Sequence, residues 1–535
     1  MPHMSFRTSA VRTPITQLKR LCIITMLTAI ASTTSGQIGD VDPSFDTDGV
    51  LNLPDGSGAE YINAIDHAAN GDLVITGTDW DVVANTYYVG GIPVWRRASN
   101  GSAVSSWGTN GFTYIDLPDG REEGQKIIAQ PDGKVLIGGV RWTADSSQLM
   151  FVRLLSNGAL DPSFGTGGYT LITGSPALVP LFIGGIPALK GIADLHLNSD
   201  GSYTAVGTTA AQGGFNVTLG FVLRLTSTGA IDGSFGANGL FLHGSGDNET
   251  FRDAEFYADG SILCGGAHNG SDNSWVKVTA GGSVDMTFGT AGVQVTPTST
   301  TRGITSFVRD ANGDLYANCS SSVFTEKRLV KFDQNGQVVA GYGTGGEVAF
   351  GSLDQRVEMD AQQRVVVWGR QSDNTLFIAQ YSTSTGTELD YWPFYPGSYN
   401  VPGDQYRILA YDEDSNGNYV IGGQGFVPGF SYNAWSARVS GNGGNGFTDL
   451  TGTARVSAFP NPTAERITLR AEATGQHAYR LVIKDLAGRS VLAADRFTFT
   501  DQGTIVLDLH DLPQGSYGLH ISEGDLTTFL RFVKY

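Results

Sequence analysis

The chain has 535 residues, of which 72 are glycine, about twice the usual share. Charged residues make up 16% and hydrophobic residues 40%. This composition argues against a helical bundle or coiled coil, which needs Ala, Leu, Glu and Lys, and against wholesale disorder. A large all-β protein with many tight turns is the class that remains.

The first 36 residues have the order of a secretory signal peptide. Basic residues without an acid come first, the apolar run 21–31 follows, and small residues 32–36 close the segment. The apolar run is shorter than the roughly 20 residues that a membrane-spanning helix needs. We therefore expect cleavage near Gln37, export of the remainder, and no transmembrane span.

Charge divides the rest of the chain. Residues 37–454 carry a net charge of −22, whereas residues 455–535 carry nine basic and nine acidic side chains. The change predicts a domain boundary near residue 450. A body this acidic repels nucleic acid, so no nucleic-acid partner is expected.

The cysteines left after cleavage, Cys264 and Cys319, fall on predicted strands of neighbouring repeats, where two buried thiols are favoured over a disulfide.

One pattern that recurs along 37–441 is an aromatic residue followed by a glycine-rich turn. Its copies centre on Phe45, Trp107, Phe164, Phe235, Phe288 and Tyr342, at intervals that average about 59 residues. Segment 389–394 is interpreted as a decayed seventh copy. We expect the aromatic side chains to pack between repeats, and the Asp of each Asp-Pro-Ser-Phe copy to form a hydrogen bond within its own turn.

A second pattern alternates with the first: Asn-Gly or Asp-Gly followed by an apolar strand, as at Asn70-Gly71 and Asp132-Gly133. This pair is the strongest short-range signal for a β-hairpin. Each unit is expected to hold four short strands, which in the second unit are 112–117, 126–130, 134–140 and 149–155. Seven such units predict a seven-bladed β-propeller over residues 37–441.

The copies Asp161–Gly168 and Pro131–Gly139 resemble the delta-60 repeat of bacterial secreted proteins, and the resemblance extends over about 400 residues. It implies a propeller-like extracellular module rather than a defined reaction.

After a flexible linker over 442–454, residues 455–535 show about seven short alternating strands, as expected of a small immunoglobulin-like β-sandwich. The segment resembles the C-terminal sorting domain of the type IX secretion system of Bacteroidetes. The motif residues that carry this resemblance are Pro460, Asn461, Pro462, Gly488, Gly515 and Tyr517. The resemblance implies the type IX machinery as a partner and removal of the domain during export. It also implies a secreted or outer-membrane surface location, with surface lipopolysaccharide as a possible point of attachment.

Metal and catalytic motifs are sparse. Asp412, Asp414 and Asn416 match the first half of a calcium-binding loop, although Gly423 stands where that pattern needs Glu. The alternative for this segment is a plain hairpin turn. No zinc-protease helix, nucleophile elbow or Walker A loop occurs, so no catalytic residue and no other cofactor is assigned. A glycosidase-type carboxylate pair stays open because acids are plentiful.

The sequence therefore favours an exported, non-catalytic binding or adhesion propeller whose ligand is a glycan or a surface protein. One alternative is a secreted hydrolase or lyase that acts on polysaccharide. Another is a structural component of the cell surface. The long segments 80–94 and 173–190 are the candidate contact surface.

Overall fold

The computed structural model describes residues 42–439 and 456–534 with gaps. The gaps are residues 43, 47–48, 54–58, 84–85, 144–146, 174–181, 184–185, 188–190, 211–217, 245–247, 271, 297–300, 322–326, 351, 372–375, 395–404, 427–431, 460–465, 472–478, 486–489, 498–503, 514 and 524–525. Every element among the described residues is a strand, and none of these residues forms an apolar helix long enough to cross a membrane. The predicted signal segment 1–36 and the predicted linker lie outside them.

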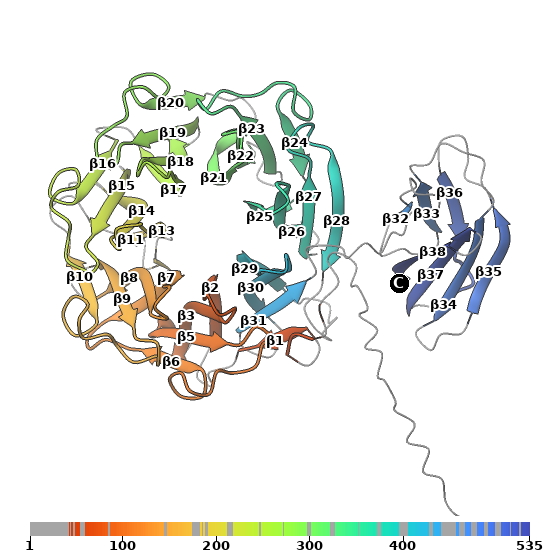
Figure 1. Ribbon diagram of the computed structural model, residues 1–535, viewed down its shortest axis with the longest axis horizontal. Helices are drawn as coiled ribbons and strands as arrows, with labels where there is room; N and C mark the ends of the chain where they lie inside the picture. Colours follow the sequence, from red (N-terminus) through yellow and green to blue (C-terminus); the bar gives the residue numbers. More distant parts are fainter. Residues whose placement is uncertain are drawn as a thin grey trace, which may run out of the picture. The chain divides into compact units, whose positions relative to one another are not determined.

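Seven antiparallel sheets surround a common axis and form a seven-bladed propeller (Figure 1). From the innermost strand outward, blade 1 holds β2 (Ala59–His67), β3 (Leu73–Val83), β5 (Ile92–Arg97) and β6 (Phe112–Ile115), with β4 (Thr86–Val89) paired to β3. Blade 2 holds β7 (Arg121–Ala129), β8 (Val135–Trp142), β9 (Ser147–Leu154) and β10 (Tyr169–Thr173). Blade 3 holds β13 (Ile192–Leu197), β14 (Tyr203–Ala210), β15 (Thr218–Leu225) and β16 (Leu240–His243), preceded by the small hairpin β11 (Phe182–Ile183) and β12 (Ile186–Pro187).

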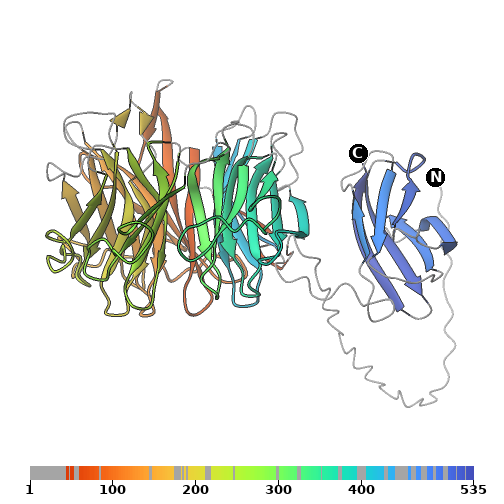
Figure 2. The same ribbon diagram turned by 90° about the horizontal axis from the view of Figure 1, so that it is seen from above.

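The remaining blades follow the same order. Blade 4 holds β17 (Glu249–Phe256), β18 (Ile262–His268), β19 (Asp272–Val278) and β20 (Val293–Thr296). Blade 5 holds β21 (Thr301–Arg309), β22 (Leu315–Ser321), β23 (Lys327–Phe332) and β24 (Glu347–Phe350). Blade 6 holds β25 (Ser352–Met359), β26 (Val365–Gln371), β27 (Leu376–Tyr381) and β28 (Glu388–Phe394). Figure 2 shows the blades from the side, with their strands running along the axis.

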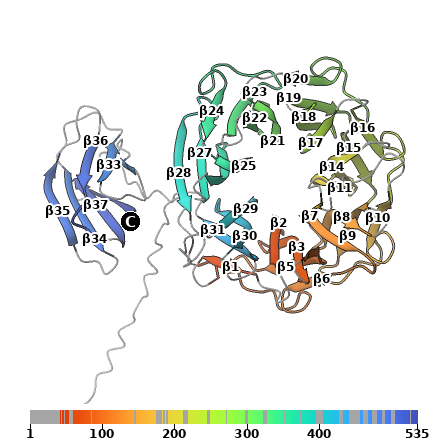
Figure 3. The ribbon, with the colours of Figure 1, turned by 180° about the vertical axis from the view of Figure 1, so that it is seen from behind.

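Blade 7 closes the ring with strands from both ends of the propeller. Its inner strands are β29 (Gln405–Glu413), β30 (Tyr419–Phe426) and β31 (Tyr432–Val439), and its outer strand is β1 (Val50–Asn52) from the start of the chain (Figure 3). The register pairs Val50 with Ala437 and Asn52 with Trp435. Closure in this way removes the open sheet edges that an incomplete ring would expose.

The sequence units and the blades differ in phase by one strand. Residues 112–115, expected to begin the second unit, form β6 and pair with Trp95 and its neighbours in blade 1. The grouping of strands 112–117, 126–130, 134–140 and 149–155 into one sheet is therefore wrong, although the strands themselves are present. A cyclic repeat has the same periodicity wherever counting starts, so only the closing strand fixes the phase.

The core lies between blades, where the recurring aromatic residues are packed. Phe45, Trp107, Phe164, Phe235, Phe288 and Tyr342 are each at most 5% exposed. Asp42, Asp161 and Asp232 accept the backbone N–H of the Ser two residues later, at 2.9, 3.0 and 3.0 Å, as the turn prediction requires. Cys264 and Cys319, in the neighbouring blades 4 and 5, are buried and form no disulfide.

The C-terminal segment forms two further sheets. One contains β32 (Val456–Phe459), β33 (Arg466–Ala471) and β36 (Thr504–Asp508). The other contains β34 (Tyr479–Asp485), β35 (Ser490–Phe497), β37 (Gly515–Glu523) and β38 (Leu526–Lys534). Alternate residues such as Ile467, Leu469, Leu481 and Ile483 are fully buried. The all-β prediction is confirmed, whereas the immunoglobulin-like assignment of this segment stays a prediction.

Candidate functional site

A β-bulge in the innermost strands brings polar side chains to the axis of the propeller. The bulge lies at the same place in six blades, for example between Gly124 and Lys126 in blade 2 and between Phe251 and Asp253 in blade 4. A bulge bends its strand and re-aims the residues that follow it. The positions that follow the bulge, and the corresponding positions of blade 6, carry polar residues in most blades: Asp66, Lys126, Asp194, Asp253, Glu255, Arg356, Glu358 and Asp412.

These side chains act on one another across different blades. Burial, together with the charges of Asp253 and Asp194, raises the pKa of Glu358 to about 8, although Lys126 and Arg356 oppose the shift. Burial and the same neighbouring acids raise the pKa of Glu255 to about 7. Since each group responds to charges on other blades, blades 2, 3, 4 and 6 present one shared electrostatic environment around the axis.

Part of this acidic set holds neighbouring blades together. Asp66 accepts the backbone N–H of Ala129 at 2.7 Å, and Asp253 accepts that of Phe307 at 2.8 Å. Glu255 accepts the N–H of Arg309 at 3.1 Å. Each bond runs from the inner strand of one blade to the inner strand of the next, so these carboxylates have a structural task.

The predicted calcium residues take part in hydrogen bonds within the protein. Asp412 contacts the His67 ring across the ring closure, with 2.6 Å between Oδ2 and Nδ1. Asp414 accepts the N–H groups of Asn416 and Asn418 at 2.8 and 2.9 Å, as in a hairpin turn. Within the described residues no three His, Cys, Asp or Glu side chains are arranged to hold a metal ion. The calcium assignment stays a prediction.

The sorting-domain motif is only partly described. Pro460, Asn461, Pro462 and Gly488 lie outside the described residues. Gly515 begins β37, and Tyr517 in the same strand is 5% exposed and donates its hydroxyl to the Pro513 carbonyl at 2.6 Å. Tyr517 therefore anchors the turn that precedes its strand.

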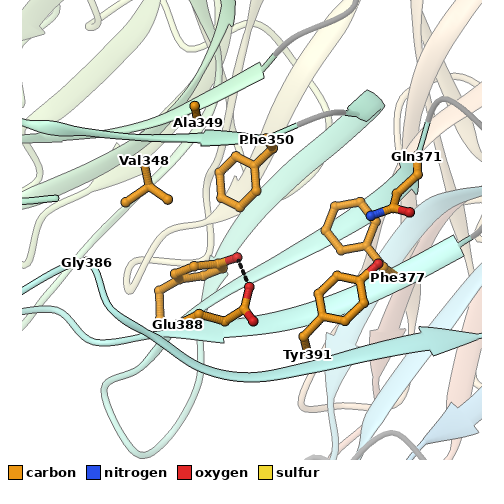
Figure 4. Close-up of a pocket in the computed structure, with 9 residues that line it drawn as sticks. Val348, Ala349, Phe350, Gln371, Phe377, Gly386, Glu388 and Tyr391 are labelled. Carbon is orange, nitrogen blue, oxygen red and sulfur yellow. Dashed lines mark hydrogen bonds between the residues drawn. The ribbon is translucent and has the colours of Figure 1, made fainter. Parts of the chain in front are cut away.

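A cavity of about 290 Å³ lies between blades 5 and 6, away from the axis. It is lined by Val348, Ala349, Phe350, Gln371, Phe377, Tyr381, Gly386, Glu388 and Tyr391 (Figure 4). The outer strand β24 supplies one wall, and strands β26 to β28 of the next blade supply the other. We call this the aromatic cavity.

Four rings and one carboxylate define the chemistry of the aromatic cavity. Phe350 and Tyr381 meet edge to face with centroids 5.3 Å apart, and Phe377 and Tyr391 stack with centroids 5.7 Å apart. Tyr381 donates its hydroxyl to Glu388 at 2.8 Å, and burial, reinforced by Glu388, raises the pKa of Tyr381. The phenol therefore stays neutral and holds the exposed Glu388 carboxylate in place.

Sequence analysis did not identify this cavity. Residues 389–394, interpreted as a decayed seventh copy of the aromatic turn, instead form most of β28, and Tyr391 lines the cavity. The signal available in the sequence was the cluster of rings in this segment.

Of the candidate contact surface, residues 80–83 and 86–89 pair as a β-hairpin that extends blade 1, while most of 173–190 lies outside the described residues.

Comparison with known families matches two parts of the chain. Residues 130–164 match the family described as "Domain of unknown function (DUF5122) beta-propeller". Residues 457–535 match the family described as "Secretion system C-terminal sorting domain". The second match marks the protein for secretion or attachment to the cell surface and for handling by the type IX machinery. No curated protein matches the chain.

Solved structures include distant likenesses. A polysaccharide lyase, Uly1, is 12% identical, with a TM-score of 0.40 over 73% of this chain and 91% of the lyase. A point mutant of the NanB sialidase from Streptococcus pneumoniae is 8% identical, with a TM-score of 0.35 over 73% of this chain and 70% of the sialidase. Likenesses at this level carry no argument about activity.

Proposed function

Since the chain is a β-propeller protein with a type IX sorting domain, we propose that it is an exported binding protein that recognises a glycan in the aromatic cavity. The observation that carries this proposal is the combination of four rings with an oriented carboxylate. Sugar rings present apolar C–H faces and hydroxyl edges, so they match flat aromatic walls and acceptor oxygens. A volume of about 290 Å³ is at the lower end of the range of small-ligand sites.

Glu388 is the residue that we expect to recognise hydroxyl groups. A carboxylate has about four acceptor positions, and Tyr381 occupies one of them. Gln371 adds an amide on the opposite side of the cavity, as Figure 4 shows. Hydrogen bonds to a charged acceptor are worth about 1.5–3 kcal/mol, enough to select one arrangement of hydroxyl groups over another.

The test is a glycan array with the purified full chain, followed by calorimetry on any hit, in calcium and in chelator. Glu388→Gln should weaken binding about tenfold or more, and Tyr391→Ser should do the same by removing a stacking surface. Leu389→Ala is the matched control, because Leu389 is 46% exposed, lies beside Glu388 and does not line the cavity. Absence of glycan binding, or binding that is unchanged in Glu388→Gln and Tyr391→Ser, would refute the proposal. Loss of binding in chelator alone would support the calcium prediction.

A polysaccharide-cleaving enzyme is the second candidate, and the axial carboxylates favour it. A carboxyl group with a pKa of about 8, such as Glu358, is still protonated at neutral pH and can act as a general acid. Release of reducing ends from a polysaccharide panel, abolished by Glu358→Gln, would establish this activity. The hypothesis of a purely structural surface component has less support. A structural role predicts an axis without converging polar groups, whereas the innermost strands carry several charged residues.

We also propose that the sorting domain is removed during export, after which the protein is either released into the medium or attached to surface lipopolysaccharide. Fractionation of cells that produce the protein would separate the two outcomes.

A further inference from the structure

A second cavity, of about 260 Å³, lies between blades 3 and 4 and contains a buried carboxylate. It is lined by Leu242, His243, Gly244, Glu249, His268, Val293 and Val295. We call it the histidine cavity. It shares no residue with the aromatic cavity.

The two cavities occupy the same place in the repeat. His268 lies two residues after Gly266, and Gln371 lies two residues after Gly369, which is the corresponding glycine of blade 6. In the same register His243 takes the position of Phe350, and Val293 that of Tyr391. The repeat therefore forms comparable spaces between blades, and the side chains decide what each space can bind.

Glu249 is the group in the histidine cavity that lacks a full set of partners. Its side chain is 1% exposed, and its Oε2 contacts His268 Nδ1 at 3.0 Å. Its other oxygen, Oε1, is buried and has no hydrogen-bond partner among the described residues. A buried, half-satisfied carboxylate is costly, which favours a ligand that donates a hydrogen bond to the unpaired Oε1.

Neither neighbouring imidazole is hydrogen-bonded to Glu249 Oε1. His268 Nδ1 contacts only the other carboxylate oxygen, Oε2, and its Nε2 lies 3.0 Å from the side-chain nitrogen of Asn269. His243 lies between Phe241 and Phe251, and burial lowers its pKa even though Glu249 acts in the opposite direction. The remaining lining is apolar apart from Gly244.

We propose that the histidine cavity binds the ammonium group of a small organic amine, with Glu249 as its anion and His243 and the valines around its carbon body. An ammonium group offers three donors and a full charge, which suits a buried acceptor oxygen. A transition metal is the competing occupant for two imidazoles and a carboxylate. It is disfavoured because, within the described part of the chain, no three such groups converge on one point.

The experiment uses glucosamine as the probe and N-acetylglucosamine as its uncharged counterpart, titrated into the purified full chain by calorimetry. Glucosamine should bind at one site and N-acetylglucosamine at least tenfold more weakly. Glu249→Gln keeps the size of the side chain and should remove the preference for the amine. Leu389→Ala, on an exposed residue that lines neither cavity, should leave it unchanged. Since the two cavities share no residue, failure here and failure of the glycan proposal can be told apart.

A second measurement protects the test against a folding defect. Histidine ring resonances of the unaltered protein should shift for His268 and His243 when glucosamine is added. Equal affinity for the two sugars, no shift of these rings, or stoichiometric zinc binding that is lost in Glu249→Gln would each overturn the proposal.

Discussion

Asp161 connects Ser163 and Arg153 in the turn that joins β9 to β10. Its carboxylate accepts from Ser163 within the turn and pairs with Arg153 at 2.8 Å. The Arg153 guanidinium lies 4.7 Å from the centre of the Phe164 ring and donates to the Ser227 carbonyl of the next blade. The same set recurs at the ring closure, where Arg438 pairs with Asp42 and lies over Phe45. The Asp, Arg and aromatic positions of the repeat therefore depend on one another.

Replacing Asp161 with Asn should destabilise the propeller by about 2–4 kcal/mol, because it leaves the buried Arg153 without its counter-ion. Urea unfolding of the full chain measures this loss. Asp232→Asn is the matched control, since Asp232 is a half-buried copy that bonds Ser234 in its own turn. Equal losses at the two positions would mean that the turn hydrogen bond, rather than the ion pair, is what matters.

In each blade with the shared bulge except blade 5, the bulge of the inner strand lies opposite a glycine in the second strand. A Cβ at Gly139 would lie 1.9 Å from the Glu123 carbonyl oxygen, and one at Gly77 would lie 1.6 Å from that of Tyr61. Blades 3, 4 and 7 have glycine at the same position, whereas blade 5 has Cys319. In blade 5 the inner strand has a second irregularity, between Thr301 and Ile304, which accompanies the larger side chain.

Gly139→Ala should therefore lower the free energy of unfolding by more than about 2 kcal/mol, because the backbone of β7 must move to admit the methyl group. Gly233→Ala is a suitable control, since a Cβ at that position meets nothing within 4 Å. Denaturation midpoints of the two variants should differ clearly, and a Gly139→Ala protein as stable as the control would show that the bulge adapts at little cost.

The strands and hairpins of the propeller could be predicted because their sequence signals are local. Asn-Gly and Asp-Gly turns and apolar alternation identify the hairpins, and the number of repeats predicts seven blades. The partner strand of β6 could not be predicted from the sequence. Phe112 pairs with Trp95 of the preceding unit, and this assignment is fixed only by residues 50–52, which supply the outer strand of blade 7 in the same way. The aromatic cavity was missed for a similar reason: Phe350 and Tyr391 belong to different blades, and they line one cavity only when the two blades lie side by side.

Proton binding should make the whole propeller most stable in mildly acidic solution. Burial raises the pKa of Asp66 and Asp253 to about 6 and that of Glu123 to about 7, besides Glu255 and Glu358. Unfolding returns these groups to about 4, so the folded state holds more protons between about pH 4 and 8 and its stability falls as the pH rises. Turn aspartates such as Asp200, whose pKa is lowered by hydrogen bonds from Ser202, act in the opposite sense at lower pH.

Thermal unfolding midpoints should therefore be higher near pH 5 than near pH 8. Glu358→Gln should reduce that difference, because an amide has no proton to lose. Met286→Gln, on an exposed side chain that has no proton to bind or lose, should leave it unchanged. A midpoint that rises steadily from pH 5 to pH 8 would contradict this account of the axial carboxylates.

Closure by β1 also sets how the ring responds to force. Three residue pairs, from Val50 to Asn52, join β1 to β31, while eight pairs join β31 to β30. A pull on the N-terminal end therefore loads the shortest strand pairing among the described strands of the seven blades, and the blades beyond it still have all their strands. We expect tension to detach β1 first, because β31 holds it by three residue pairs, and the ring to close again when the load is released.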